Sequence, residues 1–269
     1  MKWEKLEKIF DPSEHKLYED YIGYAQSPQV LIFEDFVRIY FSIRKQSDNG
    51  KYISHIQYID MDKKFTKILN VSNHEVIPIG DLGCYDEHGI FPINVLKHEN
   101  KIYAYLSGWS RRVSVSVETG IGLAMSYDDG KTFKRLGNGP VLTSSLSEPY
   151  LIVDGFVKNY DGIFHMWYIY GTDWTQSDKS SEPERTYKIG HAISEDGINW
   201  KKELKQIISD SIEYECQALP TVIKIKNRYH MYFAYRGTFD FRNNSNNAYK
   251  IGYAYSDDLI TWIRDDQKV

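Results

Sequence analysis

The stretch Lys188–Trp200, KIGHAISEDGINW, decides the fold because the chain repeats it. It recurs as GIGLAMSYDDGKTF over Gly120–Phe133 and as KIGYAYSDDLITW over Lys250–Trp262, and a more divergent copy, YISHIQYIDMDKKF, covers Tyr52–Phe65. Each copy alternates apolar and small residues, turns through Asp-Gly or an acidic equivalent, and resumes with an aromatic residue. This pattern is typical of a β-hairpin.

The spacing of the copies indicates a repeat architecture. The aromatic residues that close them lie 68, 67 and 62 residues apart, at Phe65, Phe133, Trp200 and Trp262. The segment Trp3–Phe10 resembles the residues that follow each hairpin turn, and Trp3 precedes Phe65 by 62 residues. The N-terminus therefore begins in phase with the repeat.

A second hairpin lies inside each period, at Pro28–Arg44, Pro92–Leu106, Gly155–Tyr170 and Pro220–Arg236. Two hairpins give four short antiparallel strands per period, and radially repeated four-stranded sheets are the blades of a β-propeller. Four complete blades fit within residues 24–75, 88–141, 150–208 and 215–269. Because residues 3–10 then remain as a surplus outer strand, we predict a five-bladed propeller whose fifth blade is incomplete in this chain. A four-bladed ring with a loose N-terminal strand is the alternative.

Composition agrees with a single all-β domain over residues 1–269, since 15% of the residues are aromatic and 22 are Tyr. A formal charge of -4 and a pI near 6.1 offer no basic surface for nucleic acid. The charged N-terminus does not resemble a signal peptide, and no apolar run approaches the ~20 residues of a membrane span. These features predict a cytoplasmic protein with no membrane partner. With no disulfide framework, Cys84 and Cys216 are expected to be free thiols.

Acidic residues stand near the start of several first strands. Glu215 and Glu87 each lie five residues before a proline, at Pro220 and Pro92, while Asp154 directly precedes Gly155. Carboxylates that crowd together raise one another's pKa, so that one can act as an acid while another acts as a base. We therefore expect a catalytic site at the end of the propeller that carries the long loops.

The Ala-x-Ser-x-Asp-Gly-x-x-Trp hairpin and the acidic strand starts resemble the five-bladed β-propeller glycosidases, the clan that contains glycoside hydrolase families 32, 43 and 68. The resemblance implies that Glu215, in the sequence Tyr-Glu-Cys, is the general acid and that Asp154 stabilises the transition state or tunes a pKa. Ser27 departs from the family pattern, because it stands where the clan has an Asp in blade one. The missing carboxylate is expected from Glu87 or the neighbouring Asp86, with Asp20 or the absent fifth blade as alternatives.

Other residues at the same end are candidates for substrate contact. Arg44 and Arg236 end equivalent strands. Each could bind a phosphate or carboxylate of the ligand, or could instead pair with a nearby acid of the protein, and the sequence leaves both roles open. His88 is a candidate contact, and Trp109 and Trp174 could stack on a sugar ring. No motif indicates a metal or a cofactor, and none is expected.

Two functions follow from these features. The first is a glycosidase or transglycosidase that acts on a small saccharide or sugar conjugate, which could be anionic, with Glu215, Asp154 and Glu87 as the catalytic residues. The second is a non-hydrolytic propeller that binds or modifies sugars or sugar nucleotides in surface-polysaccharide metabolism. Ser27 and the two arginines favour the second.

Overall fold

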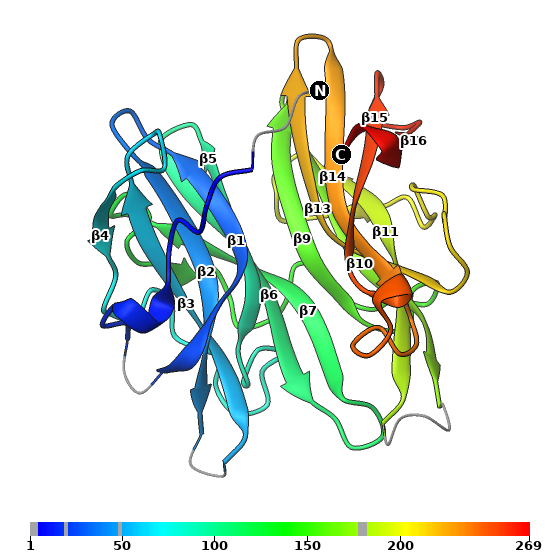
Figure 1. The fold of residues 1–269 in the computed structure, drawn as a ribbon, viewed down its shortest axis with the longest axis horizontal. Helices are drawn as coiled ribbons and strands as arrows, with labels where there is room; N and C mark the ends of the chain where they lie inside the picture. The colour runs from blue at the N-terminus through cyan, green and yellow to red at the C-terminus, as the bar shows by residue number, and fades with distance from the viewer. Residues whose placement is uncertain (1–4, 19–20, 48–49, 177–181) are drawn as a thin grey trace. The chain divides into compact units, whose positions relative to one another are not determined.

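The computed structural model describes residues 5–18, 21–47, 50–176 and 182–269. Within these residues the strands form four sheets, each of four strands in sequence order and antiparallel (Figure 1). We call the sheets blades one to four. Blade one contains β1 (Tyr21–Ile32), β2 (Val37–Gln46), β3 (Tyr52–Met61) and β4 (Ile68–Val71); blade two contains β5 (Ile90–His98), β6 (Lys101–Arg111), β7 (Val117–Ser126) and β8 (Lys134–Arg135). Blade three contains β9 (Ile152–Tyr160), β10 (Ile163–Thr175), β11 (Glu184–Ser194) and β12 (Lys201–Lys202); blade four contains β13 (Glu215–Ile225), β14 (Arg228–Gly237), β15 (Lys250–Ser256) and β16 (Ile263–Arg264). Three short 3-10 helices complete the described elements, at Pro12–Glu14, Ser245–Asn247 and Asp266–Lys268.

The chain divides into two compact units. The N-terminal unit comprises Glu4–Ser110 and Thr119–Val141 and carries blades one and two, apart from the tip of the hairpin between β6 and β7. The C-terminal unit comprises that tip, Arg111–Glu118, together with Leu142–Val269, and carries blades three and four.

The repeated hairpin has the same turn in blades two, three and four. The serine hydroxyl donates to the aspartate two residues later and accepts the backbone N–H at the tip of the turn, with bonds of 2.8–3.0 Å, at Ser126–Gly130, Ser194–Gly197 and Ser256–Leu259. The tip residue has a φ of +78° at Gly130 and +73° at Gly197, which explains the glycine there. Leu259 adopts the same conformation at φ +66°. The serine and aspartate therefore fix the turn locally.

Side chains that alternate between the two faces of the second strands fill the apolar cores. In β2, Val37, Ile39, Phe41 and Ile43 enter one apolar cluster, whereas Tyr40 enters another with residues of blade two. Since successive side chains of a strand point to opposite faces, a strand buried on both faces joins two cores. In the C-terminal unit, Trp167 of β10 lies in the cluster that blades three and four share.

The prediction of five blades is wrong, since the described residues contain four blades. Trp3 lies outside the described residues, and residues 5–10 form no strand. Leu6 and Ile9 are 56% and 37% exposed, so the segment does not alternate into a sheet. Phe10 instead packs against Phe41 at a tilted angle, with ring centroids 5.3 Å apart, and joins the apolar cluster of blade one. The N-terminal segment thus covers a face of blade one.

Within the described residues, no helix combines the length and apolar character that crossing a bilayer would require.

Candidate functional site

Each first strand contains the same β-bulge. Two residues of the first strand face one residue of the second strand at Ser27–Pro28, Phe91–Pro92, Asp154–Gly155 and Leu219–Pro220. Proline cannot donate to the ladder, and an extra residue bends the strand and re-aims its side chains. The residue before the proline or glycine has a φ of +52° at Ser27, +58° at Asp154 and +50° at Leu219. Three of the four blades thus present a bulge residue with a positive φ, and Asp154 is the acidic one.

Asp154 is buried and has few partners. Its side chain is 9% exposed, and its Oδ2 accepts one hydrogen bond, from the Leu219 N–H over 3.2 Å. Burial raises the pKa of Asp154 to about 6, although that bond and the charge of Arg185 act in the opposite direction. A carboxyl group in this environment holds its proton much nearer to neutral pH than an exposed one does.

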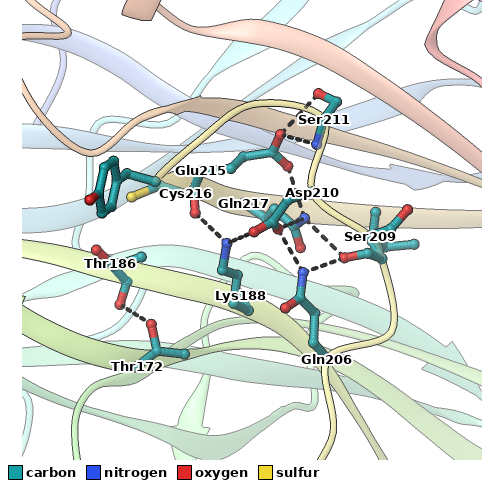
Figure 2. A network of polar contacts seen from close by, with 12 residues as sticks. Thr172, Thr186, Lys188, Gln206, Ser209, Asp210, Ser211, Glu215, Cys216 and Gln217 are labelled. Carbon is teal, nitrogen blue, oxygen red and sulfur yellow. Dashed lines mark hydrogen bonds and ion pairs between the residues drawn. The ribbon is translucent and has the colours of Figure 1, made fainter.

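Glu215 is fully buried, and both of its oxygens are occupied (Figure 2). Oε2 accepts from the N–H and hydroxyl of Ser211 at 2.9 and 3.0 Å, and Oε1 accepts from Gln217 at 2.9 Å and from Arg264 at 2.6 Å. Burial lowers the pKa of Arg264, but its hydrogen bonds to Asp266 and Glu215 outweigh the effect of burial, so the pKa of Arg264 is raised. The carboxylate that sequence reasoning chose as the acid is engaged in a structural network.

That network extends to Lys188, which is 7% exposed. Its Nζ donates to Asp210 over 2.6 Å and to the backbone carbonyl of Glu215 over 2.7 Å, as Figure 2 shows. These bonds fix the start of β13 against β11 and the preceding loop.

The ion pair between Arg264 and Glu215 repeats in two other blades. A cation stands two residues after the closing aromatic in blades two, three and four. It pairs with a buried acid that precedes the first strand of the same blade or, in blade four, begins it: Arg135–Asp86, Lys202–Glu148 and Arg264–Glu215. The three acids are 0%, 2% and 0% exposed. Glu215 is therefore equivalent to Asp86 rather than to Glu87, the residue whose spacing from the proline matched it. The acids lie at unequal distances from that proline or glycine, so counting along the sequence misaligned them.

Asp86 is enclosed by glycines in the N-terminal unit. A Cβ on Gly80 would come within 2.1 Å of its Oδ1, and one on Gly108 within 2.4 Å of its Cβ. Glycine at both places leaves room for the buried carboxylate beside Arg135. Asp86 thus anchors the loop that carries Glu87 and His88.

Glu87, His88 and Trp109, predicted separately, lie together in the N-terminal unit. His88 Nδ1 is 3.3 Å from Glu87 Oε1, and the imidazole stacks on Trp109 with ring centroids 5.8 Å apart. The other Glu87 oxygen accepts the N–H of Gly83 over 2.8 Å. The side chains of Glu87 and His88 are 19% and 24% exposed, so the pair is partly accessible.

Ser27 and Arg44 belong to blade one. Arg44 donates from Nε to Gln26 over 3.2 Å, and its guanidinium lies 5.4 Å from the centre of the Tyr24 ring. Arg44 faces Ser54 across the ladder, and the Ser54 N–H donates to the backbone carbonyl of His88 over 3.1 Å. These contacts join the end of β2 to the His88 loop.

Arg236 is buried in the C-terminal unit and is 3% exposed. It makes no ion pair with a carboxylate among the described residues; its Nη1 donates to the carbonyls of Gly237 and Thr238 at 2.7 and 3.1 Å. The guanidinium lies 3.7 Å from the centre of the Phe241 ring and 5.7 Å from that of Tyr249. Burial disfavours its charge, but Tyr187, Cys216 and Tyr249 outweigh that effect, so the pKa of Arg236 is raised.

Sequence reasoning missed Arg185, Tyr187 and Arg264. Arg185 has no counterpart in the repeated pattern, whereas Tyr187 precedes the repeated Lys-Ile-Gly just as Tyr249 does in blade four. Arg264 does have one, because basic residues also stand two positions after the closing aromatic at Arg135 and Lys202. Within the described residues, no group of three or more His, Cys, Asp or Glu side chains could hold a metal ion.

No protein-family model matches the chain. An uncharacterized protein of Mycobacterium tuberculosis (strain H37Rv) is 29% identical over 275 residues, which cover 97% of this chain and 82% of that protein. Two proteins of Thermoanaerobacter sp. (strain X514) match about half of this chain. The β-1,2-mannobiose phosphorylase is 29% identical over 48% of this chain and 43% of its own length, and the 1,2-β-oligomannan phosphorylase is 31% identical over 49% and 43%.

Similar solved structures are glycoside hydrolases with propeller folds. A thermostable family-43 glycoside hydrolase has a TM-score of 0.64 at 16% identity and covers 93% of this chain and 75% of its own. The family-32 β-fructofuranosidase of Bombyx mori has a TM-score of 0.64 at 13% identity and covers 96% and 52%. Together with the four four-stranded sheets, these matches show an all-β propeller fold of antiparallel blades.

Proposed function

We propose that the chain cleaves the glycosidic bond of a small saccharide and that Asp154 is the general acid. The acid of such a reaction must hold a proton and release it to the leaving oxygen, which requires a carboxyl group with a raised pKa. Asp154 meets this requirement through burial, and the bulge holds it in place with a single hydrogen bond. This environment is the observation that carries the proposal.

Glu215 is proposed to have a positioning role. Its charge is satisfied by Arg264, and each of its oxygens accepts two hydrogen bonds. A carboxylate held in this way has no lone pair directed at a substrate. Equivalent buried ion pairs in blades two and three support this assignment. An ion pair that recurs in several blades is explained by the stability of the blade and does not require a catalytic role.

Glu87 remains a predicted catalytic residue, with His88 and Trp109 as predicted substrate contacts. The contact with His88 orients the Glu87 carboxylate, as a base or nucleophile requires. We also propose Ser27, at the equivalent bulge of blade one, as a substrate contact.

A second candidate reaction is phosphorolysis, which the two phosphorylase relatives favour. A phosphate oxygen would attack the anomeric carbon while the bond to the leaving oxygen breaks, and the Asp154 proton would pass to that oxygen. The products would be a sugar phosphate and the shortened saccharide. Because phosphate is already a nucleophile, this reaction needs no second carboxylate to activate water.

The test is to incubate the protein with β-1,2-mannobiose and a panel of aryl glycosides, with and without inorganic phosphate, and to separate free sugar from sugar phosphate. Release of free sugar without phosphate indicates hydrolysis, and formation of sugar phosphate indicates phosphorolysis. Asp154→Asn is expected to abolish either activity, whereas Asp161→Asn, an exposed position with the same positive φ, should retain it. Full activity in Asp154→Asn would overturn the proposed acid. Saturable saccharide binding without turnover would favour the non-hydrolytic alternative.

A further inference from the structure

We infer that Arg185 and Arg236 form a binding site for a phosphate group next to Asp154. This inference deepens the proposed function, since it names the charge of the group bound beside the proposed acid.

The first observation is the charge of Arg236. Burying a cation without a counterion is costly, and buried charges are normally paired. Arg236 has no carboxylate partner among the described residues, and its Nε is buried without a hydrogen-bond partner. Nη1 is occupied by two carbonyls and the Tyr249 side chain also bonds the guanidinium, so Nε is the donor left for an anion.

Arg185, near the start of β11, provides the second cation. Its guanidinium lies 5.9 Å from the centre of the Trp174 ring and 3.4 Å from the Ser116 hydroxyl, and the described residues give it no ion pair with a carboxylate. Its charge acts on the carboxyl of Asp154.

Both arginines act on Tyr187. Burial raises the pKa of this phenol, and the charges of Arg236 and Arg185 oppose the rise. The Arg236 guanidinium lies 5.4 Å from the centre of the Tyr187 ring, and Arg185 lies two residues before Tyr187 on β11 and therefore on the same face of the strand. Tyr187 thus lies beside both cations, and Arg185 also acts on Asp154.

The backbone that carries the two arginines is rigidly connected. The hydroxyls of Thr186 and Thr238 lie 3.0 Å apart, and Cys216 Sγ bonds to the carbonyl of Arg185 at 3.3 Å and to Thr238 at 3.2 Å. Figure 2 shows Thr186 and Cys216 at the edge of the Glu215 network. A site whose donors are already held in position loses little entropy when it binds a ligand.

Phosphate suits these donors because guanidinium groups bind its oxygens in pairs. The rings of Phe241 and Tyr249 shield Arg236 from water, which strengthens its attraction for an anion. Tyr249 is itself 57% exposed, so the shield borders solvent. The phosphate could be inorganic phosphate that takes part in the reaction or a phosphate ester carried by the saccharide.

The test is calorimetric titration of the whole chain with inorganic phosphate and, separately, with hexose phosphates, at ionic strength held constant with chloride. We expect binding in the millimolar range or tighter, weakened about tenfold or more in both Arg185→Gln and Arg236→Gln, as loss of a charge-assisted bond predicts. Arg228→Gln is the matched control, since Arg228 lies at the other end of β14, exposed and paired with Asp257. Binding of inorganic phosphate identifies a co-reactant, and binding of hexose phosphate alone identifies an ester on the saccharide.

The absence of binding by either anion, or binding by Arg185→Gln as tight as by wild type, would overturn the site. If Arg236→Gln does not fold, the phosphate affinity of Arg185→Gln alone tests the site. Arg185 is half-buried and is not part of the core, so this variant is expected to fold. Titration of Asp154→Asn separates this inference from the proposed acid. Phosphate binding with no turnover in wild type would keep the site and remove the proposed function, and turnover without phosphate binding would do the reverse.

Discussion

Arg264 holds Glu215 in a buried ion pair, with 2.6 Å between Nη1 and Oε1, although 49 residues separate them in sequence. The same pairing ties Lys202, in the fourth strand of blade three, to Glu148, which precedes the first strand of that blade, over 2.7 Å. The start and end of a blade are thus joined by one ion pair, which makes Glu215 a determinant of stability.

Replacing Glu215 with Gln should therefore destabilise the C-terminal unit. Loss of one partner from a buried ion pair costs about 3–5 kcal/mol, because the remaining charge stays buried. Glu148→Gln should cause a loss of similar size, whereas Glu213→Gln, at an exposed position, should cause little. Denaturant unfolding of the three variants measures the difference. Unchanged stability with lost activity in Glu215→Gln would restore Glu215 as the acid.

Replacing Asp154 with Asn should stabilise the protein above pH 6. Because the folded pKa is raised, folding favours the protonated carboxyl, and this contribution is full below the unfolded pKa and is lost as pH rises through about 6. Asn stays neutral and can still accept the Leu219 bond, so the gain should be on the order of 2–3 kcal/mol at pH 8 and near zero at pH 4. Thermal unfolding across this range checks the prediction. An equal gain at both pH values would show that ionisation of Asp154 is not its cause.

The activity of wild type should decline as pH rises through about 6, if Asp154 is the acid. Only the protonated carboxyl can donate, so the fraction of active enzyme falls tenfold for each pH unit above the pKa. The measurement is kcat/KM against pH with a substrate found in the panel described above. A rate that is flat from pH 5 to pH 8 would contradict the assignment.

His55 should make the N-terminal unit sensitive to acid. Burial, reinforced by Lys45, lowers its pKa to about 4, so folding favours the neutral ring. That stability is complete above the unfolded pKa of about 6.5 and is lost as pH falls toward 4, by up to roughly 3 kcal/mol. His55→Gln should remove this part of the slope, and His98→Gln, at the half-buried end of β5, serves as the comparison. If the free energy of unfolding, measured with denaturant, falls with pH equally in wild type and His55→Gln, His55 is not the source of the acid sensitivity.

Arg38 and Asp60 should stabilise blade one strongly. Arg38 is 2% exposed, forms two bonds of 2.6 and 2.9 Å with Asp60, and donates to the carbonyl of Asp129 at 2.8 Å. Asp60→Asn should cost about 3 kcal/mol or more. Glu118→Gln, which breaks an exposed pair with Arg112, should cost less than about 1 kcal/mol. Equal losses in the two variants would show that burial does not set the strength of these pairs.

The strands and turns were predictable because neighbours in the sequence determine them. Alternation of apolar residues, the Ser-x-Asp turn and the proline or glycine of each first strand act over a few residues, and all appear in the structure as the pattern indicates. The number of blades was not predictable, because Trp3–Phe10 resembles an outer strand only locally. Phe10 packs against Phe41 of β2, and this tertiary contact determines where the N-terminal segment lies.

The repeated sequence by itself thus determined a propeller of four-stranded blades and placed Asp154 near the start of a first strand. Only the tertiary structure decided that Glu215 is held in an ion pair and that Arg236, within the part of the chain that the structure describes, is not. Arg264 reaches Glu215 from 49 residues away, while Arg236, the partner sequence reasoning considered, remains without a carboxylate among the described residues. Charge pairing depends on which groups packing buries together, and a linear pattern of apolar residues does not encode that choice.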